Sequence, residues 1–359
     1  MANRSEIQVP AGKRVTLAQV ASAAGLARTT VSDILNRNAG GKYSECTREL
    51  VSQTVARLGY APYRPAQQLA RGKSGQVGLL LTRDFSNPFW ARVANAVERA
   101  LRARKYRLQL AVSENDPDAE AAHARQLRDD GVEGLIVGPV YEPKDAELHQ
   151  AYLRGLLPLV IFGMRSDRFD SVVIDERASG DLATTHLQGL GHRRIGYIAA
   201  PDADLDAAEV SRFSAMRDRL RTAGTYEPRW IIRHPDQGRY EDFAAAADRF
   251  AAQWLAAPAD QRPTAVLCHN DQCATAALAC FHRRGLAVPG DLSVVAFDNL
   301  PEAAFLIPAL TTIDNCVEQQ MSAAVDLLVQ RLDAGRGRAR TVVIPPRLVV
   351  RDSTSPPAA

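Results

Sequence analysis

The sequence lacks the features of a secreted, membrane-bound or metal-holding protein. No leader with an apolar core opens the chain, and no apolar run is long enough for a transmembrane helix. The five cysteines are odd in number and lack the paired spacing of zinc ligands, so we expect buried, reduced thiols. These absences predict a cytoplasmic protein without a metal site.

The sequence also lacks the motifs of common enzyme classes. Neither the phosphate-binding motif Gly-x-x-x-x-Gly-Lys-Ser/Thr nor the nucleophile motif Gly-x-Ser-x-Gly is present. Gly189-Leu-Gly191 lacks the further glycine that a dinucleotide-binding loop needs. His186 and His192 flank a turn from helix to strand, where a structural role is favoured over a catalytic one. We therefore predict no enzyme, no catalytic residue and no cofactor.

The first seventy residues contain the clearest local signals. Thr16, with Gln19 three residues later, forms a capping box that begins a helix, and Gly25 is typical of a helix end. The apolar spacing predicts a second helix over 28–36 and a third from 44 or 47 to 58. The residues expected to close a three-helix core are Leu17, Val20, Ala21, Ala24, Val31, Ile34, Leu35, Leu50, Val51, Val55 and Leu58.

Charge is distributed unevenly along the chain. Residues 1–73 contain eleven Lys and Arg against four Asp and Glu, a net charge of +7; the whole chain carries +3, so the rest carries −4. A positive head attracts phosphates, which favours a nucleic-acid partner. A helical bundle with a solvated basic face is the alternative, which the tight spacing of two helices across Gly25 disfavours.

Several short motifs in this head occur together, namely Val-Thr-Leu at 15–17, Ala-Ala-Gly at 23–25, Thr-Val-Ser at 30–32, Ile-Leu-Asn at 34–36, Gly-Tyr at 59–60 and Pro62. In these motifs the head resembles the DNA-binding domain of the LacI/GalR family of bacterial transcription regulators. The resemblance implies that Arg28, Thr29 and Asp33 read bases. It implies phosphate contacts for Thr16, Thr30, Ser32, Asn36, Ser44 and Thr47.

Asp33 departs from the family pattern, in which arginine is usual at this position. An arginine binds guanine through two donors, whereas a carboxylate only accepts, for example from cytosine N4, so the operator should differ accordingly. The alternative is an ion pair with Arg37 one turn later on the helix surface. The sequence does not separate these two interpretations.

Residues 61–73 form a predicted hinge, whose middle can become a short helix from Pro65. Six or seven residues make a marginal helix alone, so its order would depend on DNA and on dimer contacts. By the resemblance, Ala66 and Leu69 reach the minor groove, where an apolar wedge unstacks bases. An ordinary tether with Leu69 packed on the body is the alternative.

Beyond residue 74 the chain alternates short aliphatic runs with longer amphipathic stretches, which is typical of parallel strands joined by helices. The expected strands are 77–81, 108–112, 134–137, 159–162, 171–174, 195–199, 265–268, 292–297, 341–344 and 348–350. Roughly 285 residues exceed a single core, so two Rossmann-like lobes are expected.

The predicted fold class is therefore an all-α helix-turn-helix head, 14–60, and an α/β two-lobed body similar to periplasmic binding proteins, with two Rossmann-like parallel sheets. The resemblance implies an effector-binding and dimerisation domain over 74–352, with three crossings between lobes. Lobe 1 would comprise about 74–191 and 314–344. Lobe 2 would comprise about 192–313 and 345–352, and 353–359 would be a disordered tail.

Polar residues cluster where strands of the body end, which is where open α/β sheets bind ligands. The expected effector-binding residues are Asp84, Phe89, Trp90, Asp175, Arg212, Asn270 and Asp298. Their donors and acceptors suit vicinal hydroxyls, and the aromatics offer a flat apolar face, so a carbohydrate is the expected ligand. Structural alternatives exist, since Asp271 can cap a helix and Asp175 can serve the lobe crossover.

The sequence as a whole predicts a repressor that binds a palindromic operator as a homodimer and responds to a small-molecule effector. The carboxyl-terminal segment lacks the heptad helix of a tetramer. A periplasmic solute receptor is the main alternative, but the basic head and the missing signal peptide argue against it. A sugar-modifying enzyme and a regulator without a ligand are the others.

Overall fold

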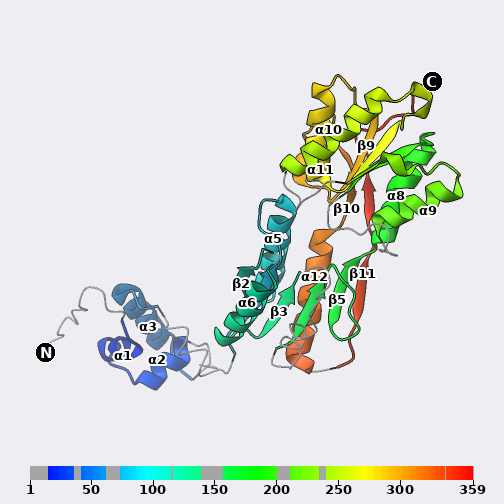
Figure 1. The fold of residues 1–359 in the computed structure, drawn as a ribbon. Coiled ribbons are helices and arrows are strands. Elements are labelled where there is room, and N and C mark those ends of the chain that lie inside the picture. Colours follow the sequence, from blue (N-terminus) through cyan, green and yellow to red (C-terminus); the bar gives the residue numbers. More distant parts are fainter. Residues whose placement is uncertain are drawn as a thin grey trace. The chain divides into compact units, whose positions relative to one another are not determined.

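The computed structural model describes residues 15–35, 42–61, 73–114, 116–138, 157–199, 211–233, 240–335 and 337–358. The chain divides between Ser74 and Gly75 into two compact units, a small head and a large body (Figure 1). Among the described residues, no helix is both long and apolar enough to span a membrane. The predicted fold class, a helical head followed by a two-lobed α/β body, is confirmed.

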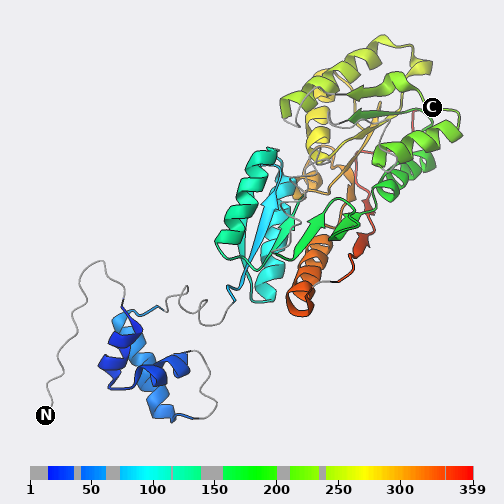
Figure 2. The same ribbon diagram turned by 60° about the horizontal axis from the view of Figure 1, so that its bottom comes forward.

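The described residues of the head form three helices, drawn in blue in Figure 2. They are α1 Leu17–Ala24, α2 Arg28–Leu35 and α3 Glu45–Leu58. Thr16 and Gln19 form the predicted capping box, and Gly25 and Gly59 end α1 and α3 in the left-handed conformation that glycine adopts most easily. Ser44 caps α3, so the earlier of its two predicted starts is the observed one.

Three valines, one from each helix, are fully buried in the head: Val20, Val31 and Val51. Leu50, predicted for this core, is instead 41% exposed. The inward face of α3 is set by Val51 and Thr54, which lie three residues apart, and Leu50 falls beside this face. The predicted core is therefore wrong at Leu50.

The described part of the body contains two six-stranded sheets, one in each lobe. The first sheet runs in the order β11 Thr341–Ile344, β5 Asp170–Ile174, β4 Leu159–Phe162, β3 Gly134–Val137, β1 Gln76–Leu81 and β2 Arg107–Val112. The second runs in the order β12 Arg347–Val349, β10 Thr311–Asp314, β9 Ser293–Phe297, β8 Ala265–Cys268, β6 Ile195–Ala199 and β7 Ile231–Arg233. All pairs are parallel except β10 with β12.

Helices cover both faces of the first sheet. On one face pack α5 Pro88–Ala103 and α12 Val317–Ala334, and on the other packs α6 Pro117–Asp129. Successive residues of β1 point to opposite faces, so Leu79 and Leu81 belong to the core under α5 and α12, whereas Leu80 belongs to the core under α6.

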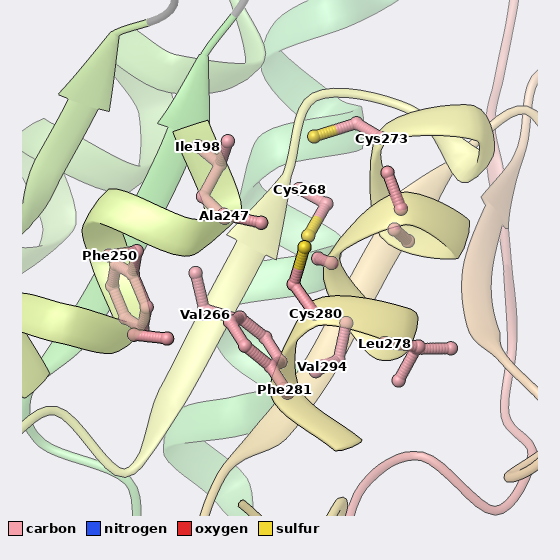
Figure 3. Packing of buried hydrophobic residues seen from close by; sticks show 14 of the residues in the cluster. Ile198, Ala247, Phe250, Val266, Cys268, Cys273, Leu278, Cys280, Phe281 and Val294 are labelled. Atoms are coloured by element: carbon pink, nitrogen blue, oxygen red, sulfur yellow. The ribbon is translucent and has the colours of Figure 1, made fainter. Parts of the chain in front are cut away.

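The second sheet has the same plan. On one face pack α10 Tyr240–Ala256 and α11 Asp271–Arg283, and on the other pack α8 Glu176–Gly189 and α9 Arg212–Thr222. Figure 3 shows the first of these cores, with Phe250 and Phe281 from the helices beside Val266 and Val294 from the strands. Short 3₁₀ helices complete the lobe: η1 Pro228–Trp230, η2 Ala259–Gln261 and η3 Pro301–Ala304.

Three cysteines, Cys268, Cys273 and Cys280, lie in this second-lobe core (Figure 3). They and Cys316 are buried and free, as predicted, because a thiol packs as a small apolar group. Cys46 on α3 is free but exposed, so the prediction of burial is wrong there.

The chain crosses between the lobes after β5, after β10 and after β11, which gives the expected three crossings. The expected division at residue 191 is wrong. Ala183 and Leu187 of α8 pack with Phe213 of α9 and with strands of the second sheet. The first crossing therefore follows Ile174, because α8 buries its apolar face on the second lobe.

The expected disordered tail is also wrong for residues 353–358, which are ordered on the second lobe. Ser353 is fully buried; its hydroxyl donates to the Val294 carbonyl at 2.6 Å and accepts from the Thr311 amide at 2.8 Å. His192 Nε2 lies 2.8 Å from the Ser355 carbonyl oxygen. Polar hydrogen bonds hold this segment, so its Ser-, Thr- and Pro-rich composition gave no sign of order.

Two strands of the second sheet, β7 and β10, were not predicted. β7 is Ile-Ile-Arg and β10 is Thr-Thr-Ile-Asp, so neither shows the aliphatic run by which other short strands were predicted. Two edge strands depart from the buried, parallel pattern of the other strands. β2 is an edge strand with Leu110 40% exposed, and β12 is antiparallel.

Candidate functional site

The outer side of α2 presents polar side chains. Val31 is completely buried against the other helices of the head, which turns Arg28 and Thr29 outward, where both are exposed. Thr30 and Ser32 are half-buried beside them. A helix with this pattern offers hydrogen-bond donors and acceptors in a row, which is what base edges in a major groove require.

Asp33, the third predicted base-reading residue, has a partner that the sequence did not suggest. The Tyr43 hydroxyl, one residue before the cap of α3, donates a hydrogen bond to Asp33 Oδ2 at 3.0 Å. Asp33 is half-buried, so one carboxylate oxygen is held while the residue keeps access to solvent. Arg37, the alternative ion-pair partner, lies outside the described residues.

Three of the predicted phosphate-contacting residues stand at helix starts. Thr16 Oγ1 accepts from the Gln19 amide at 3.3 Å, and Ser44 Oγ accepts from the Thr47 amide at 3.3 Å. The Ser44 and Thr47 hydroxyls lie 2.8 Å apart. Helix amino-terminal ends carry positive partial charge and favour phosphates, so α1 and α3 are suitably placed for this role. Asn36, Ala66 and Leu69, with the rest of the hinge from 62 to 72, lie outside the described residues.

Arg212, the first residue of α9, is the most heavily bonded of the predicted effector residues. Its Nε and Nη2 donate to the two Glu176 carboxylate oxygens at 2.7 and 2.8 Å, and Nη1 donates to the His269 carbonyl at 2.9 Å. The guanidinium also lies 4.5 Å from the centre of the Phe297 ring. Burial lowers the pKa of Arg212, but the nearby Glu176 carboxylate raises it by a larger amount. The net shift of the Arg212 pKa is therefore upward.

Asp298 follows β9 and is buried, with 6% of its surface exposed. Its φ of 110° is in the region that favours glycine, and Asn315 Nδ2 donates to its Oδ1 at 2.7 Å. Burial raises the pKa of Asp298 well above its usual value, while Arg212 opposes that rise. A buried carboxyl beside a charged guanidinium is a group whose protonation a bound ligand can change.

Asn270, and not the expected Asp271, caps the helix that follows β8. Asn270 is the N-cap of α11, with its Oδ1 accepting from the Cys273 amide at 2.7 Å. Asp271, predicted as the cap, is instead the first residue of α11 and accepts from the Leu300 amide and the Thr312 hydroxyl. Burial raises the pKa of Asp271 to about 7, against the effect of these two hydrogen bonds.

The first-lobe candidates are less tightly held. Asp84 is exposed, and hydrogen bonds from the Ser86 hydroxyl and amide hold its pKa below the usual value. Phe89 and Trp90 begin α5 half-buried, with ring centres 5.1 Å apart and near-perpendicular planes, and Trp90 lies 6.1 Å from Phe162. Asp175 caps α8 through the Ala178 amide at 2.9 Å, directly after the strand from which the chain leaves the first lobe.

The Arg212 charge acts on Asp298 and opposes the rise in its carboxyl pKa, and both residues follow the carboxyl ends of strands in the second sheet. Sequence reasoning missed two residues at this place, Glu176 as the bidentate partner of Arg212 and Arg92 on α5. Arg92 Nη1 donates to the backbone carbonyls of Asp298 and Asn299. Glu176 directly follows Asp175, a predicted site residue, whereas no motif in the sequence marks Arg92.

Comparison with known proteins agrees with both units. Residues 16–63 match the model described as "Bacterial regulatory proteins, lacI family", and residues 184–354 match the periplasmic binding protein-like domain. The HTH-type transcriptional repressor PurR of Aliivibrio fischeri is 32% identical over 347 residues, covering 95% of this chain and 98% of that repressor. The chain belongs to the LacI family. It is therefore a DNA-binding transcriptional repressor and not an enzyme.

Other members of the family show the same relationship along their length. The PurR repressor of Proteus mirabilis is 30% identical over 345 residues, covering 95% of this chain and 97% of its own. The lac repressor dimer bound to operator and the anti-inducer ONPF superposes with a TM-score of 0.78 at 27% identity, covering 96% of this chain and 100% of that one. The complex of the transcriptional regulator CelR with cellobiose has a TM-score of 0.66 at 26% identity, covering 95% of this chain and 100% of CelR.

Proposed function

We propose that this LacI-family repressor binds a palindromic operator as a homodimer and that a carbohydrate-like effector, bound between the two lobes, controls its affinity for DNA. The observation that carries the proposal is that one chain combines a polar recognition face on α2 with a body that gathers Arg212 and Asp298 at strand carboxyl ends. Such a regulator acts in the cytoplasm, where the bacterial chromosome lies.

At the DNA, Arg28, Thr29 and Asp33 would read bases, while the residues at helix starts and on α2 would contact phosphates. Arg28 and Thr29 are exposed on the side of α2 away from the core, as this role requires. We propose Ala66 and Leu69 for the minor-groove contact that bends the operator centre. The net charge of +7 over residues 1–73 supports attraction to phosphates.

Dimerisation through the body is supported by an apolar segment after η3. Phe305 is 83% exposed and Ile307 is 95% exposed, while Leu306 between them packs on the second-lobe core. Burial of these two exposed apolar side chains against a second copy of the chain would stabilise a dimer. The similar lac repressor structure contains a dimer on its operator, and two heads double the contacts that one head makes.

For the effector, the polar set consists of Arg212, Asn270 and Asp298, with Phe89 and Trp90 as apolar walls. Carboxylate and guanidinium groups hydrogen-bond neighbouring hydroxyls, and aromatic rings cover the apolar face of a sugar. The similar CelR structure is a cellobiose complex, which supports a ligand of this class. Asp84 and Asp175 would contribute from the first lobe and the lobe crossover.

Selection of bound duplexes from a random pool tests the DNA function. The full chain should recover a palindrome, and Arg28→Ala should abolish the enrichment, whereas Arg57→Ala on α3 should leave the recovered bases unchanged. A panel of mono- and disaccharides, beginning with cellobiose, is then added to the complex. Arg212→Ala and Asp298→Ala should keep operator binding and lose the response. Failure to enrich any duplex would overturn the proposal.

A further inference from the structure

Arg92 connects the two lobes. It lies on α5 in the first lobe, and its Nη1 donates to the carbonyl oxygens of Asp298 at 2.9 Å and Asn299 at 3.0 Å, in the turn after β9 of the second lobe. Both acceptors are backbone carbonyl oxygens, so Arg92 constrains the backbone conformation of the turn and not its side chains. The Arg92 side chain is 17% exposed, which limits the screening of these bonds by water.

The other side of the Arg92 guanidinium is fixed within the first lobe. Its Nε and Nη2 donate to Glu318 of α12 at 3.0 and 2.7 Å. Nη2 also lies 3.6 Å from Asp314, which ends β10 and belongs to the second lobe. A planar guanidinium held at two nitrogens by one carboxylate cannot swing away from its remaining partners without breaking the pair. Arg92 is thus a rigid bridge from the first lobe and not a flexible surface side chain.

The turn that Arg92 holds is conformationally strained. Asp298 and Asn299 have φ values of 110° and 49°, in the region that side-chain-bearing residues rarely adopt. Such a conformation persists only when its surroundings impose it. Within the second lobe, the Asp298 amide donates to the Ile313 carbonyl at 2.8 Å and the Leu300 amide to Asp271 Oδ2 at 2.7 Å.

We propose that Arg92 is a positioning residue, which fixes the strained 298–299 turn from the opposite lobe and thereby aims the Asp298 carboxylate only while the two lobes are together. Through the Arg92 side chain, the orientation of Asp298, a candidate effector-binding residue, then depends on closure of the two lobes. The inference rests on the proposed function because it takes Asp298 as a residue that binds the effector. The link between the lobes stands on the hydrogen bonds alone.

Amide hydrogen exchange on the full chain, without DNA or effector, tests the bridge. In Arg92→Met, which keeps an apolar stem, the amides of Asp298 and Leu300 should exchange about tenfold faster, because two charge-assisted bonds to the turn are lost. Arg99→Met is the matched control, since Arg99 stands on the same helix and reaches Glu318 at 3.6 Å. It should leave the turn unchanged.

Unchanged exchange of the turn in Arg92→Met would overturn the proposal. If that variant fails to fold, Arg92→Gln serves in its place, since glutamine is polar but too short to bridge the lobes, and the same tenfold increase is required. Amides of β3, in the first-lobe core, report whether the fold is intact. A purely local packing role for Arg92 would loosen α5 and leave the turn across the lobe boundary protected.

The distance between the lobes provides a second readout. Spin labels are attached at Arg102→Cys on α5 and Asp260→Cys on η2, in a chain that carries Cys46→Ser to remove the exposed thiol. Arg92→Met should make the distance distribution longer and broader, and an identical distribution would count against the bridge. Neither readout uses an operator or a sugar, so failure here is distinguishable from failure of the proposed function.

Discussion

Several polar residues of this repressor make structural hydrogen bonds that the sequence did not indicate. Asn270 caps a helix, Asp271 holds a neighbouring turn, and Arg212 is clamped by Glu176. The residue types at these places were predictable, because polar groups follow buried strands. Their partners were not, since Glu176 lies 36 residues from Arg212 and only the fold brings the two together.

The Tyr43–Asp33 hydrogen bond leads to a prediction about operator sequence. In Tyr43→Phe the Asp33 carboxylate loses the group that orients it, so the preference at the base pair that Asp33 faces should weaken by about tenfold, within the range of single base contacts. Preferences at other positions should persist. Duplex selection with both proteins measures this, and Tyr60→Phe, in the same head, is the control.

An unchanged preference at every position in Tyr43→Phe would contradict a base-reading role for an oriented Asp33. The Asp33→Asn variant separates the hydrogen bond with Tyr43 from the contact that Asp33 makes with a base. The amide keeps an acceptor for Tyr43 but adds a donor, so the preferred base should change and not merely weaken.

The buried Asp271 predicts a pH dependence of stability. Its pKa is raised to about 7 in the folded protein from 3.8, so between pH 4 and 7 the folded state holds a proton that the unfolded state releases. The contribution of this group to the free energy of unfolding should therefore fall as pH rises through that window, by on the order of 4 kcal/mol.

Urea unfolding of the body at pH 4.5 and 7.5 measures that contribution as the difference between the wild type and Asp271→Asn. The variant cannot titrate at this site, so its stability should decline less with rising pH. Parallel pH profiles for the two proteins would show that the two hydrogen bonds to Asp271 keep its pKa near the unfolded value.

At the scale of elements, capping residues determined what could be predicted. Thr16 and Gly25 mark the two ends of α1 through their own backbone geometry, so the sequence located these ends correctly. β7 and β10 lack an aliphatic run, and α8 gave no sign of the lobe that it covers. The assignment of α8 to the second lobe depends on its packing with α9, and no local sequence pattern reveals this packing.

The close approach of α8 and α9 makes a testable prediction. A Cβ at Gly180 of α8 would lie 2.1 Å from the Arg212 carbonyl oxygen, a backbone atom that cannot rotate away. Gly180→Ala should therefore destabilise the second lobe by about 1–3 kcal/mol and displace Arg212. Gly189→Ala, on the same helix with no atom within 4 Å of the added carbon, should be neutral or slightly stabilising.

Thermal unfolding of the two glycine variants checks this difference. Equal melting temperatures for Gly180→Ala and Gly189→Ala would show that α8 and α9 can separate without cost. A loss confined to Gly180→Ala, together with a weakened effector response, would link the helix contact to the placement of Arg212.

At the scale of the whole molecule, the order of helical head and two-lobed body followed from charge and from the repeated strand-helix pattern. Both signals are properties of long segments, so errors at single positions average out. The carboxyl-terminal segment from Ser353 was wrongly predicted to be disordered, because it is held by hydrogen bonds to β9 and to His192 instead of by apolar burial. Composition cannot reveal that kind of order.

Equilibrium binding of the full chain to its selected palindrome tests the central claim most directly, with a single half-site and a scrambled duplex measured beside it. The account predicts two chains per palindrome, at least a hundredfold weaker binding to the half-site, and an affinity that falls steeply with salt. Equal affinity for the palindrome and the scrambled duplex at every salt concentration would contradict it.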